Sequence, residues 1–400
     1  HVRGMNCCIR AWVSRMQPSS TTLLAEVELV KDADALADAV MRLTHGRAEV
    51  RAEGGSAVIH TDARLPAGLV MALHKRMHEY GYLRDVYDCR ICPFDYSTTA
   101  YGTLVVVQPA EPVCPLQCPY CYAKPAPSGR MPVPDPRKLA RYVYTNFIAP
   151  LRGGSAVVNV VPWGGSSDPT LLPTSYFTNF IDELGELVAE GVEESVEVSV
   201  NLSTSGETAK VQALVDAVAD MLEEYSGLRM KSHIAVTAHP ATFPGGHRMS
   251  AAERYELKPS YEYSSVFIYP VFIVHKHISD AAGEVIGLAD RLGTKPIILA
   301  PYYTSERELS YFGFRSAREI KEELRSLVYK VLTVERMVYL DTCSYNALFG
   351  GIKTPEFYRG RYAVVKTDGQ SVHAEYHDGT WCPRGIYSGR GCIYPPRQLT

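Results

Sequence analysis

Three cysteines of this 400-residue chain have a spacing that can bind an iron–sulfur cluster. Cys114, Cys118 and Cys121 form the run Cys-Pro-Leu-Gln-Cys-Pro-Tyr-Cys. Three thiolates so spaced on one loop can ligate three irons of a 4Fe–4S cubane and leave the fourth iron without a protein ligand. The ferredoxin patterns differ, because there a fourth cysteine closes the site. The spacing therefore predicts a cluster whose open iron accepts a chelating small molecule.

A second pair of cysteines supports an alternative metal. Cys89 and Cys92 form a C-x-x-C knuckle, and with Cys118 and Cys121 they supply the four thiolates of a zinc ribbon. The 25 residues between the two knuckles exceed the usual spacing, and Cys114 would then have no role. Zinc is therefore the alternative to iron.

Five cysteines outside the first run are candidates for an auxiliary metal site: Cys89, Cys92, Cys343, Cys382 and Cys392. If the first two fold back onto the late three, four or five thiolates meet, which is enough for a second iron–sulfur cluster. The alternative is that they are small buried apolar residues or pair as disulfides.

A parallel sheet is expected to position the cysteine run. An apolar strand at 104–107 leads into it, and further apolar strands alternate with amphipathic helices, which is typical of successive βα units. Six units predict an α/β fold with a partial (β/α)6 TIM-type barrel, open on one side, instead of the closed barrel of eight. The other five strands are expected at 156–161, 196–202, 233–237, 266–274 and 296–300.

The barrel is assigned residues 100–331, and three other ranges flank it. Residues 1–86 predict a small α+β domain of strand, helix, hairpin and helix. Residues 87–112 form a linker that carries the C-x-x-C pair into the first strand. Residues 332–400 predict a β-rich C-terminal extension, because Asp-Gly pairs at 368–369 and 378–379 are hairpin signals.

In this setting the cysteine run resembles the hallmark of the radical S-adenosylmethionine (SAM) superfamily, C-x-x-x-C-x-aromatic-C after the first barrel strand, with Tyr120 at the aromatic position. The resemblance implies that SAM chelates the open iron through its amino and carboxylate groups. It implies reductive cleavage of SAM to a 5′-deoxyadenosyl radical, which removes hydrogen from a substrate. It also implies oxygen sensitivity and an electron donor such as ferredoxin or flavodoxin.

A glycine turn fits the same resemblance. Gly164, Gly165 and Ser166 follow the second strand, where the family commonly has Gly-Gly-Glu-Pro to meet the SAM amino group, and bare backbone lets SAM approach closely. The glutamate is absent here. Ser166, Ser167 and Asp168 are the candidates to replace it.

The stretch after the third strand has a matching role in the resemblance. It runs from Asn201 to Gly206 and includes Ser203. Its amides and hydroxyls lie where the family contacts the ribose or carboxylate of SAM. The resemblance therefore implies that Asn201 and Ser203 bind the cofactor.

Polar side chains after the later strands are candidates to position substrate or relay protons. In a parallel barrel such residues gather at the carboxyl ends of the strands. For each of them the alternative is an ordinary loop or core residue. The candidates are His239, His275, His277, Tyr302, Tyr303 and Asp341.

The bulk composition limits the class of protein. With 46% apolar and 21% charged residues the chain can bury a large core, and its net charge of −3 gives no general attraction to nucleic acid. No apolar run is long enough for a membrane span, and no secretory signal is seen, so we expect a cytoplasmic protein. Asn and Gln are scarce, which is typical of thermophile proteins.

Three functions remain in competition. The first is radical modification of a peptide or protein, because the N-terminal domain can grip a macromolecule and the cysteine-bearing tail resembles SPASM and twitch extensions, although those have denser cysteine patterns. The second is radical modification of a tRNA or a small metabolite. The third is a zinc-binding module without enzymatic activity.

Overall fold

The computed structural model describes most of the chain. The described residues are 22–29, 32–53, 56–61, 65–86, 91–93, 102–118, 121, 125–151, 156–164, 167–191, 196–244, 249–301, 306–334, 336–349 and 362–376. In this part of the chain, no helix combines the length and the apolar character that crossing a membrane requires.

The N-terminal unit is a four-stranded antiparallel sheet with two helices. Its strand order is β2-β3-β1-β4, the arrangement of a split β-α-β unit. The strand, helix, hairpin and helix predicted from sequence are all present, and β4 is an additional strand. The elements are β1 (Thr22–Leu29), α2 (Ala33–Thr44), β2 (Ala48–Glu53), β3 (Ser56–Thr61), α3 (Ala67–Tyr80) and β4 (Gly81–Val86).

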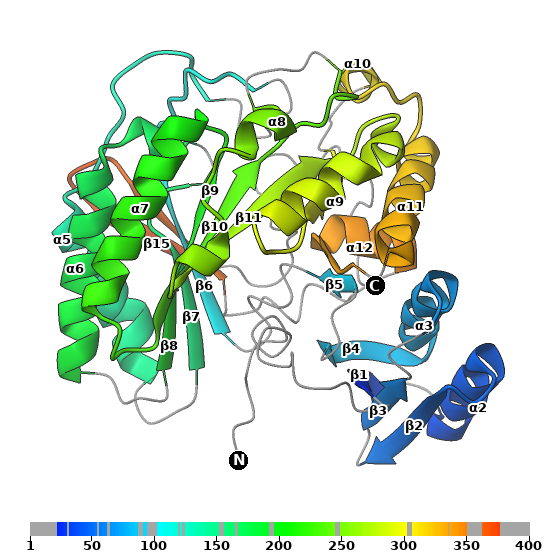
Figure 1. Cartoon of the computed structure of the whole chain (residues 1–400). Helices are drawn as coiled ribbons and strands as arrows, with labels where there is room; N and C mark the ends of the chain where they lie inside the picture. The colour runs from blue at the N-terminus through cyan, green and yellow to red at the C-terminus, as the bar shows by residue number, and fades with distance from the viewer. Residues whose placement is uncertain are drawn as a thin grey trace.

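A large parallel sheet forms the rest of the fold, with helices around its outside (Figure 1). The partial TIM-like α/β fold is confirmed, because all six predicted strands are present and each pairs in parallel with its neighbours. The predicted strand 196–202 corresponds to two strands, β8 and β9, and β13 follows the six predicted strands in the sheet. The strands are β6 (Gly102–Pro109), β7 (Ala156–Val161), β8 (Val196–Val200), β9 (Leu202–Thr204), β10 (Met230–Thr237), β11 (Val266–Ile273), β12 (Ile297–Leu299) and β13 (Val338–Leu340).

Helices and short helical turns connect these strands. The helices are α5 (Pro136–Val143), α6 (Thr174–Gly191), α7 (Thr208–Glu224), α8 (Ala251–Arg254), α9 (Ala282–Arg291), α10 (Glu306–Tyr311), α11 (Ala317–Thr333) and α12 (Thr342–Phe349). The short turns are the π-helical turn Tyr144–Ile148 and the 3-10 turns Ala149–Leu151, Pro169–Leu171, Ser260–Glu262 and Ile278–Ala281.

Both edges of the sheet are extended by strands from outside the predicted barrel range. Strand β14 (Tyr362–Thr367) runs parallel to β6 and forms the predicted Asp-Gly hairpin with β15 (Val372–Tyr376). At the other edge, β5 (Ile91–Pro93) runs parallel to β13. The sheet therefore includes parts of the ranges 87–112 and 332–400, while the domain boundaries themselves stay a prediction.

The two faces of the central strands differ in burial. Alternate side chains of a strand point to opposite faces, and those of Ile234, Val236 and Ile268 are completely or almost completely buried. On the other face of β10, His233 and Ala235 are only half-buried. The face that carries His233 and Ala235, called the second face below, lines the inside of the partial barrel. Part of the inner surface of the barrel therefore stays accessible.

The N-terminal unit is held against the barrel through α3. This helix contacts α11 and α12, and the buried His74 places Nδ1 2.7 Å from the hydroxyl of Tyr345 on α12. The ring of His74 also lies 5.4 Å from that of Phe349. The two parts consequently share one continuous apolar core.

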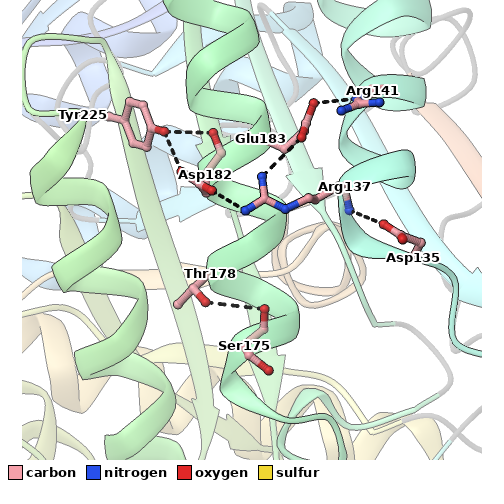
Figure 2. Close-up of polar contacts among 8 residues, drawn as sticks. All are labelled: Asp135, Arg137, Arg141, Ser175, Thr178, Asp182, Glu183 and Tyr225. Atoms are coloured by element: carbon pink, nitrogen blue, oxygen red, sulfur yellow. Dashed lines mark hydrogen bonds and ion pairs between the residues drawn. The ribbon is translucent and has the colours of Figure 1, made fainter.

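Helices α5 and α6 are joined by an ionic cluster (Figure 2). The guanidinium of Arg137 contacts Asp182 at 2.6 Å and Glu183 at 3.3 Å, and Arg141 contacts Glu183 at 2.5 Å. From α7's C-terminal end, the Tyr225 hydroxyl donates to the Asp182 side chain at 2.9 Å. Since α5 begins where the cysteine-bearing loop ends, this cluster anchors one end of that loop.

Candidate active site at the carboxyl end of the parallel sheet

The cysteine run lies on a loop that closes on itself after β6. The Cys114 N–H donates to the Ala126 carbonyl at 2.9 Å, and the Ala126 N–H donates to Pro112 at 3.0 Å. The Gln117 side-chain amide donates to the carbonyls of Cys114 and Pro125, at 2.6 and 3.0 Å. These bonds fix the start and end of the loop relative to the strand.

The three thiols have different surroundings. Cys114 is buried, whereas Cys118 and Cys121 are part-exposed. Burial raises the pKa of the Cys114 thiol, and backbone N–H donors at Leu116 and Asp168 oppose that rise. Such N–H···S bonds stabilise a thiolate, the form that ligates metal.

The residue types of the loop suit a thiophilic metal. Within the described residues, no three His, Cys, Asp or Glu side chains form a group able to hold a metal ion. The loop carries Tyr120, which lies outside the described residues. A donor set of three thiols suits the iron of a cluster, and a cluster at this loop stays a prediction.

The glycine turn after β7 has no space for a side chain at its first position. A Cβ on Gly164 would lie 2.8 Å from Cγ1 of Val161. The Gly164 N–H donates to the Val107 carbonyl on β6 at 3.1 Å, so the turn is held against the neighbouring strand. Gly165 and Ser166 lie outside the described residues, and their predicted contact with SAM stays a prediction.

Asp168 joins the loops that follow β7 and β9. Its Oδ1 accepts from the hydroxyls of Thr170 and Thr204, at 2.6 and 2.8 Å, and from the Thr170 N–H at 2.9 Å. Its Oδ2 accepts from the Ser205 N–H at 2.6 Å. The neighbouring Ser167 instead donates its hydroxyl to the Val113 carbonyl in the cysteine loop, at 2.9 Å.

The hydrogen bonds continue to the end of β10. The hydroxyls of Ser205 and Thr237 are 2.9 Å apart. Buried Arg254, on α8, donates to the carbonyls of Thr237 and Gly206, at 3.0 and 2.7 Å. Together with Asp168 these residues form a hydrogen-bonded chain that runs from Asp168 through Thr204 and Ser205 to Thr237 and Arg254.

The predicted cofactor residues Asn201 and Ser203 lie on the second face of the strands. The Asn201 side chain bonds to Asn159 on β7 at 3.1 Å, and its oxygen accepts from Ser199 at 2.7 Å and from the His233 N–H at 3.1 Å. It therefore holds three strands together. Ser203 is exposed, and a role of either residue in binding SAM stays a prediction.

Two of the predicted histidines lie together at the barrel mouth. His239 stacks on Phe243 with ring centroids 3.9 Å apart, and Phe243 meets the edge of His275 at 5.0 Å. Burial lowers the pKa of each imidazole to about 4, and in His239 the charge of Arg254 adds to the effect. Both histidines are therefore neutral at physiological pH.

Tyr311 extends the aromatic cluster around the histidine pair. The Tyr311 ring lies 6.3 Å from that of Phe243. Burial raises the pKa of Tyr311, with a smaller contribution from Cys118 of the cysteine loop. Thr242 completes the cluster, with its hydroxyl 2.9 Å from Nε2 of His275.

The other predicted polar residues have different positions. His277 is exposed and pairs with Asp280 at 3.5 Å, away from the histidine pair. Buried Asp341 accepts from the Ala300 N–H at 3.2 Å and so holds the ends of β12 and β13 together. Tyr302 and Tyr303 lie outside the described residues.

Several residues of this region were missed by the sequence analysis. Arg254 lies on a single-turn helix too short for a periodic pattern, but the capping box of Ser250 and Glu253 was a readable signal for that helix. His233 was a polar residue within an apolar strand. Its pKa is lowered to about 3, mainly by burial, and its Nδ1 is 3.2 Å from the Tyr269 hydroxyl.

The auxiliary cysteines are described only in part. Cys92 on β5 is opposite Tyr339 of β13, and Cys343 opens α12 directly after β13, so the backbone brings these two cysteines to neighbouring elements. Cys89, Cys382 and Cys392 lie outside the described residues. An auxiliary cluster stays a prediction.

Comparison with known proteins gives only distant matches. SuiB of Streptococcus suis, in a crystal structure bound to S-adenosylmethionine, matches with a TM-score of 0.44 and 10% identity over 72% of this chain. The match covers 65% of SuiB, less than two thirds of its length. No protein-family model and no curated protein sequence matches the chain.

Two further solved structures match with lower scores. The spore cortex-lytic enzyme SleL of Bacillus megaterium has a TM-score of 0.29 and 9% identity, over 81% of this chain and 83% of SleL. Phospho-2-dehydro-3-deoxyheptonate aldolase of Thermotoga maritima has a TM-score of 0.21 and 9% identity, over 80% of this chain and all of the aldolase.

Proposed function

We propose that this chain is a radical SAM enzyme that uses a 4Fe–4S cluster held by Cys114, Cys118 and Cys121. The observation that supports this most strongly is the position of the run. It follows the first predicted strand of the parallel sheet, and the loop after the neighbouring strand β7 is bonded to it, because the Ser167 hydroxyl donates to the Val113 carbonyl at 2.9 Å. Bound cluster and SAM would supply reductive cleavage of the sulfonium and hydrogen-atom abstraction.

The protein's own residues would place the cofactor and the substrate. Gly164 is buried and its N–H is bonded to β6, so it would fix the start of the turn whose next residues are expected to meet SAM. His239 and His275 are buried and neutral beside Phe243, and their role in positioning substrate or relaying a proton stays a prediction. The electron would come from a donor such as ferredoxin or flavodoxin.

For the substrate we propose a peptide or protein. The N-terminal unit, an addition to the barrel, is the part available to hold a macromolecule. Its residues 22–86 contain ten acidic and eight basic side chains, a net charge of −2, which gives the unit no net attraction to a phosphate backbone. Modification of tRNA is therefore the weaker candidate. A small metabolite remains the alternative, because such a substrate does not have to bind to the N-terminal unit.

A zinc ribbon is less well supported. It would have to combine Cys92 with Cys118 and Cys121. Cys92 is on β5 at one edge of the sheet, whereas the cysteine loop follows β6, and six strands lie between β6 and β5 in the strand order. The two knuckles are therefore carried by strands that do not pair with each other.

Anaerobic reconstitution with iron and sulfide tests the proposal. We expect a brown protein that cleaves SAM to 5′-deoxyadenosine when reduced, and we expect Cys118→Ser to lose both iron and cleavage. Cys343→Ser is the matched control, which should keep SAM cleavage while testing the auxiliary site by its iron content. A colourless protein that holds zinc and does not cleave SAM would rule out the proposal.

A further inference from the structure

The carboxylate of Asp168 joins two loops of the site. Asp168 is buried, with only 7% of its surface exposed, and its two oxygens take four hydrogen bonds from the loops after β7 and β9. Bonds to an ionised carboxylate are stronger than neutral ones and lose more when a partner is removed.

The residue before Asp168 reaches the cysteine loop. The Ser167 hydroxyl donates to the carbonyl of Val113, the neighbour of Cys114, at 2.9 Å. The carboxylate fixes the backbone of Asp168, because it caps the turn Pro169–Leu171 through the Thr170 N–H. Any shift of the carboxylate therefore also moves Ser167 and its bond to Val113.

The loops after β7 and β9 are tightly packed where they meet at Asp168, a contact that we call the junction. A Cβ on Gly206 would lie 2.1 Å from Oγ1 of Thr170, so the loops after β7 and β9 are already in close contact. The Gly206 N–H also donates to the Thr204 hydroxyl at 2.9 Å, and that hydroxyl in turn donates to Asp168. The carboxylate thus holds two closely packed loops in one register.

We infer that Asp168 is a positioning residue that couples the cluster ligand Cys114 to the loop after β9, where SAM is expected to bind. This rests on the proposed function. The loop after β7 was expected to replace the family's glutamate at the SAM amino group. Asp168 does not replace that glutamate as the partner of the SAM amino group, because its Oδ1 already accepts three hydrogen bonds and its Oδ2 accepts one from the Ser205 N–H.

The first test needs neither cluster nor SAM. Asp168→Asn and Thr204→Val should speed amide hydrogen exchange by about tenfold in 202–207, because each removes a bond across the junction. Asp168→Asn should also speed exchange in 113–118, because Ser167, the residue before Asp168, donates to the Val113 carbonyl in this part of the cysteine loop. Thr204→Ser, which keeps the hydroxyl, should exchange like the wild type, and Thr178→Val is the control for a distant hydroxyl.

The second test uses the reconstituted protein. With iron content unchanged, Asp168→Asn should weaken SAM binding by about tenfold and change the electron paramagnetic resonance signal that SAM induces in the reduced cluster. Thr204→Val should have a smaller effect of the same kind, which Thr204→Ser reverses.

Two outcomes separate this inference from the proposed function. If the wild type cleaves SAM but Asp168→Asn changes exchange only in 202–207, with SAM affinity and cluster signal intact, Asp168 is merely structural and the inference is overturned. If the wild type holds no cluster, the proposed function fails, whatever the exchange experiment shows.

Discussion

Gly164 shows how one residue type is required where a turn packs against the end of its own strand. Because its Cβ would lie 2.8 Å from Val161, we expect Gly164→Ala to lower the free energy of unfolding by about 1–3 kcal/mol. Chemical denaturation measures this. Gly68→Ala is the control, since no atom lies within 4 Å of a Cβ there, and on helix α3 it should be neutral or stabilising. Equal effects of the two variants would contradict the packing argument.

The buried histidines make stability depend on pH. Since the folded pKa of His275 is lowered to about 4, the unfolded chain binds a proton at higher pH than the folded chain does. Stability should therefore fall as pH drops from about 6.5 toward 4. His275→Gln should be less stable at pH 7 yet lose less stability over that interval.

The measurement for His275 is denaturant unfolding at several pH values between 7 and 4.5. Unchanged pH dependence in His275→Gln would mean that other groups carry the effect, with His239 the next candidate because its pKa is also lowered to about 4.

At the scale of single residues, the sequence predicts the candidate site from residue types that have few other structural roles. Three close cysteines and a glycine pair can be read without a structure. Asp168 was only one of three candidates, because its partners Thr204 and Ser205 lie far along the chain. Residues that folding brings together from distant parts of the chain have no characteristic spacing in the sequence, so these partners could not be predicted. The contacts of Arg254 could not be predicted for the same reason.

Among the elements, α5 and α6 depend on the ionic cluster of Figure 2. The hydrogen bonds from Arg141 and Arg137 lower the pKa of Glu183, so its contribution to stability is present above its unfolded pKa and lost as pH falls through the folded pKa. Glu183→Gln should lower the melting temperature by about 2–4 °C at pH 7.

Thermal unfolding of Glu183→Gln at pH 7 and pH 3 tests this, because the difference from the wild type should shrink at the lower pH. Glu190→Gln, at an exposed position of the same helix, is the control. A difference that persists at pH 3 would assign the effect to packing and not to charge.

The elements that sequence predicted are those with strong local patterns. The strands β6, β7, β11 and β12 are mostly apolar, as buried parallel strands require. Strand β4 was missed because Arg84 and Asp85 interrupt its apolar pattern, and β5 is short and contains a proline. Both are strands because of long-range pairing, with β1 and β13 respectively.

For the whole molecule, the contact between His74 and Tyr345 joins the N-terminal unit to the barrel. Tyr345→Phe removes the hydroxyl from a buried site, and we expect it to cost about 1–3 kcal/mol. Limited proteolysis should then cut the N-terminal unit faster while the barrel stays intact. Tyr329→Phe, on the exposed side of α11, is the control. Equal protection of the N-terminal unit in both variants would show that apolar contacts alone hold it.

The position of β5 determines the order in which the protein can fold. This strand precedes β6 in the chain, yet its partner β13 is near the other end, and α3 likewise packs on α12 beyond β13. During synthesis, the contacts of β5 with β13 and of α3 with α12 therefore cannot form until almost the entire barrel has been made. Such distant pairings slow folding and leave apolar surface and an unpaired strand exposed in the meantime. A chain cut just before β13 should accordingly engage chaperones or aggregate, although it retains all three cysteines of the site.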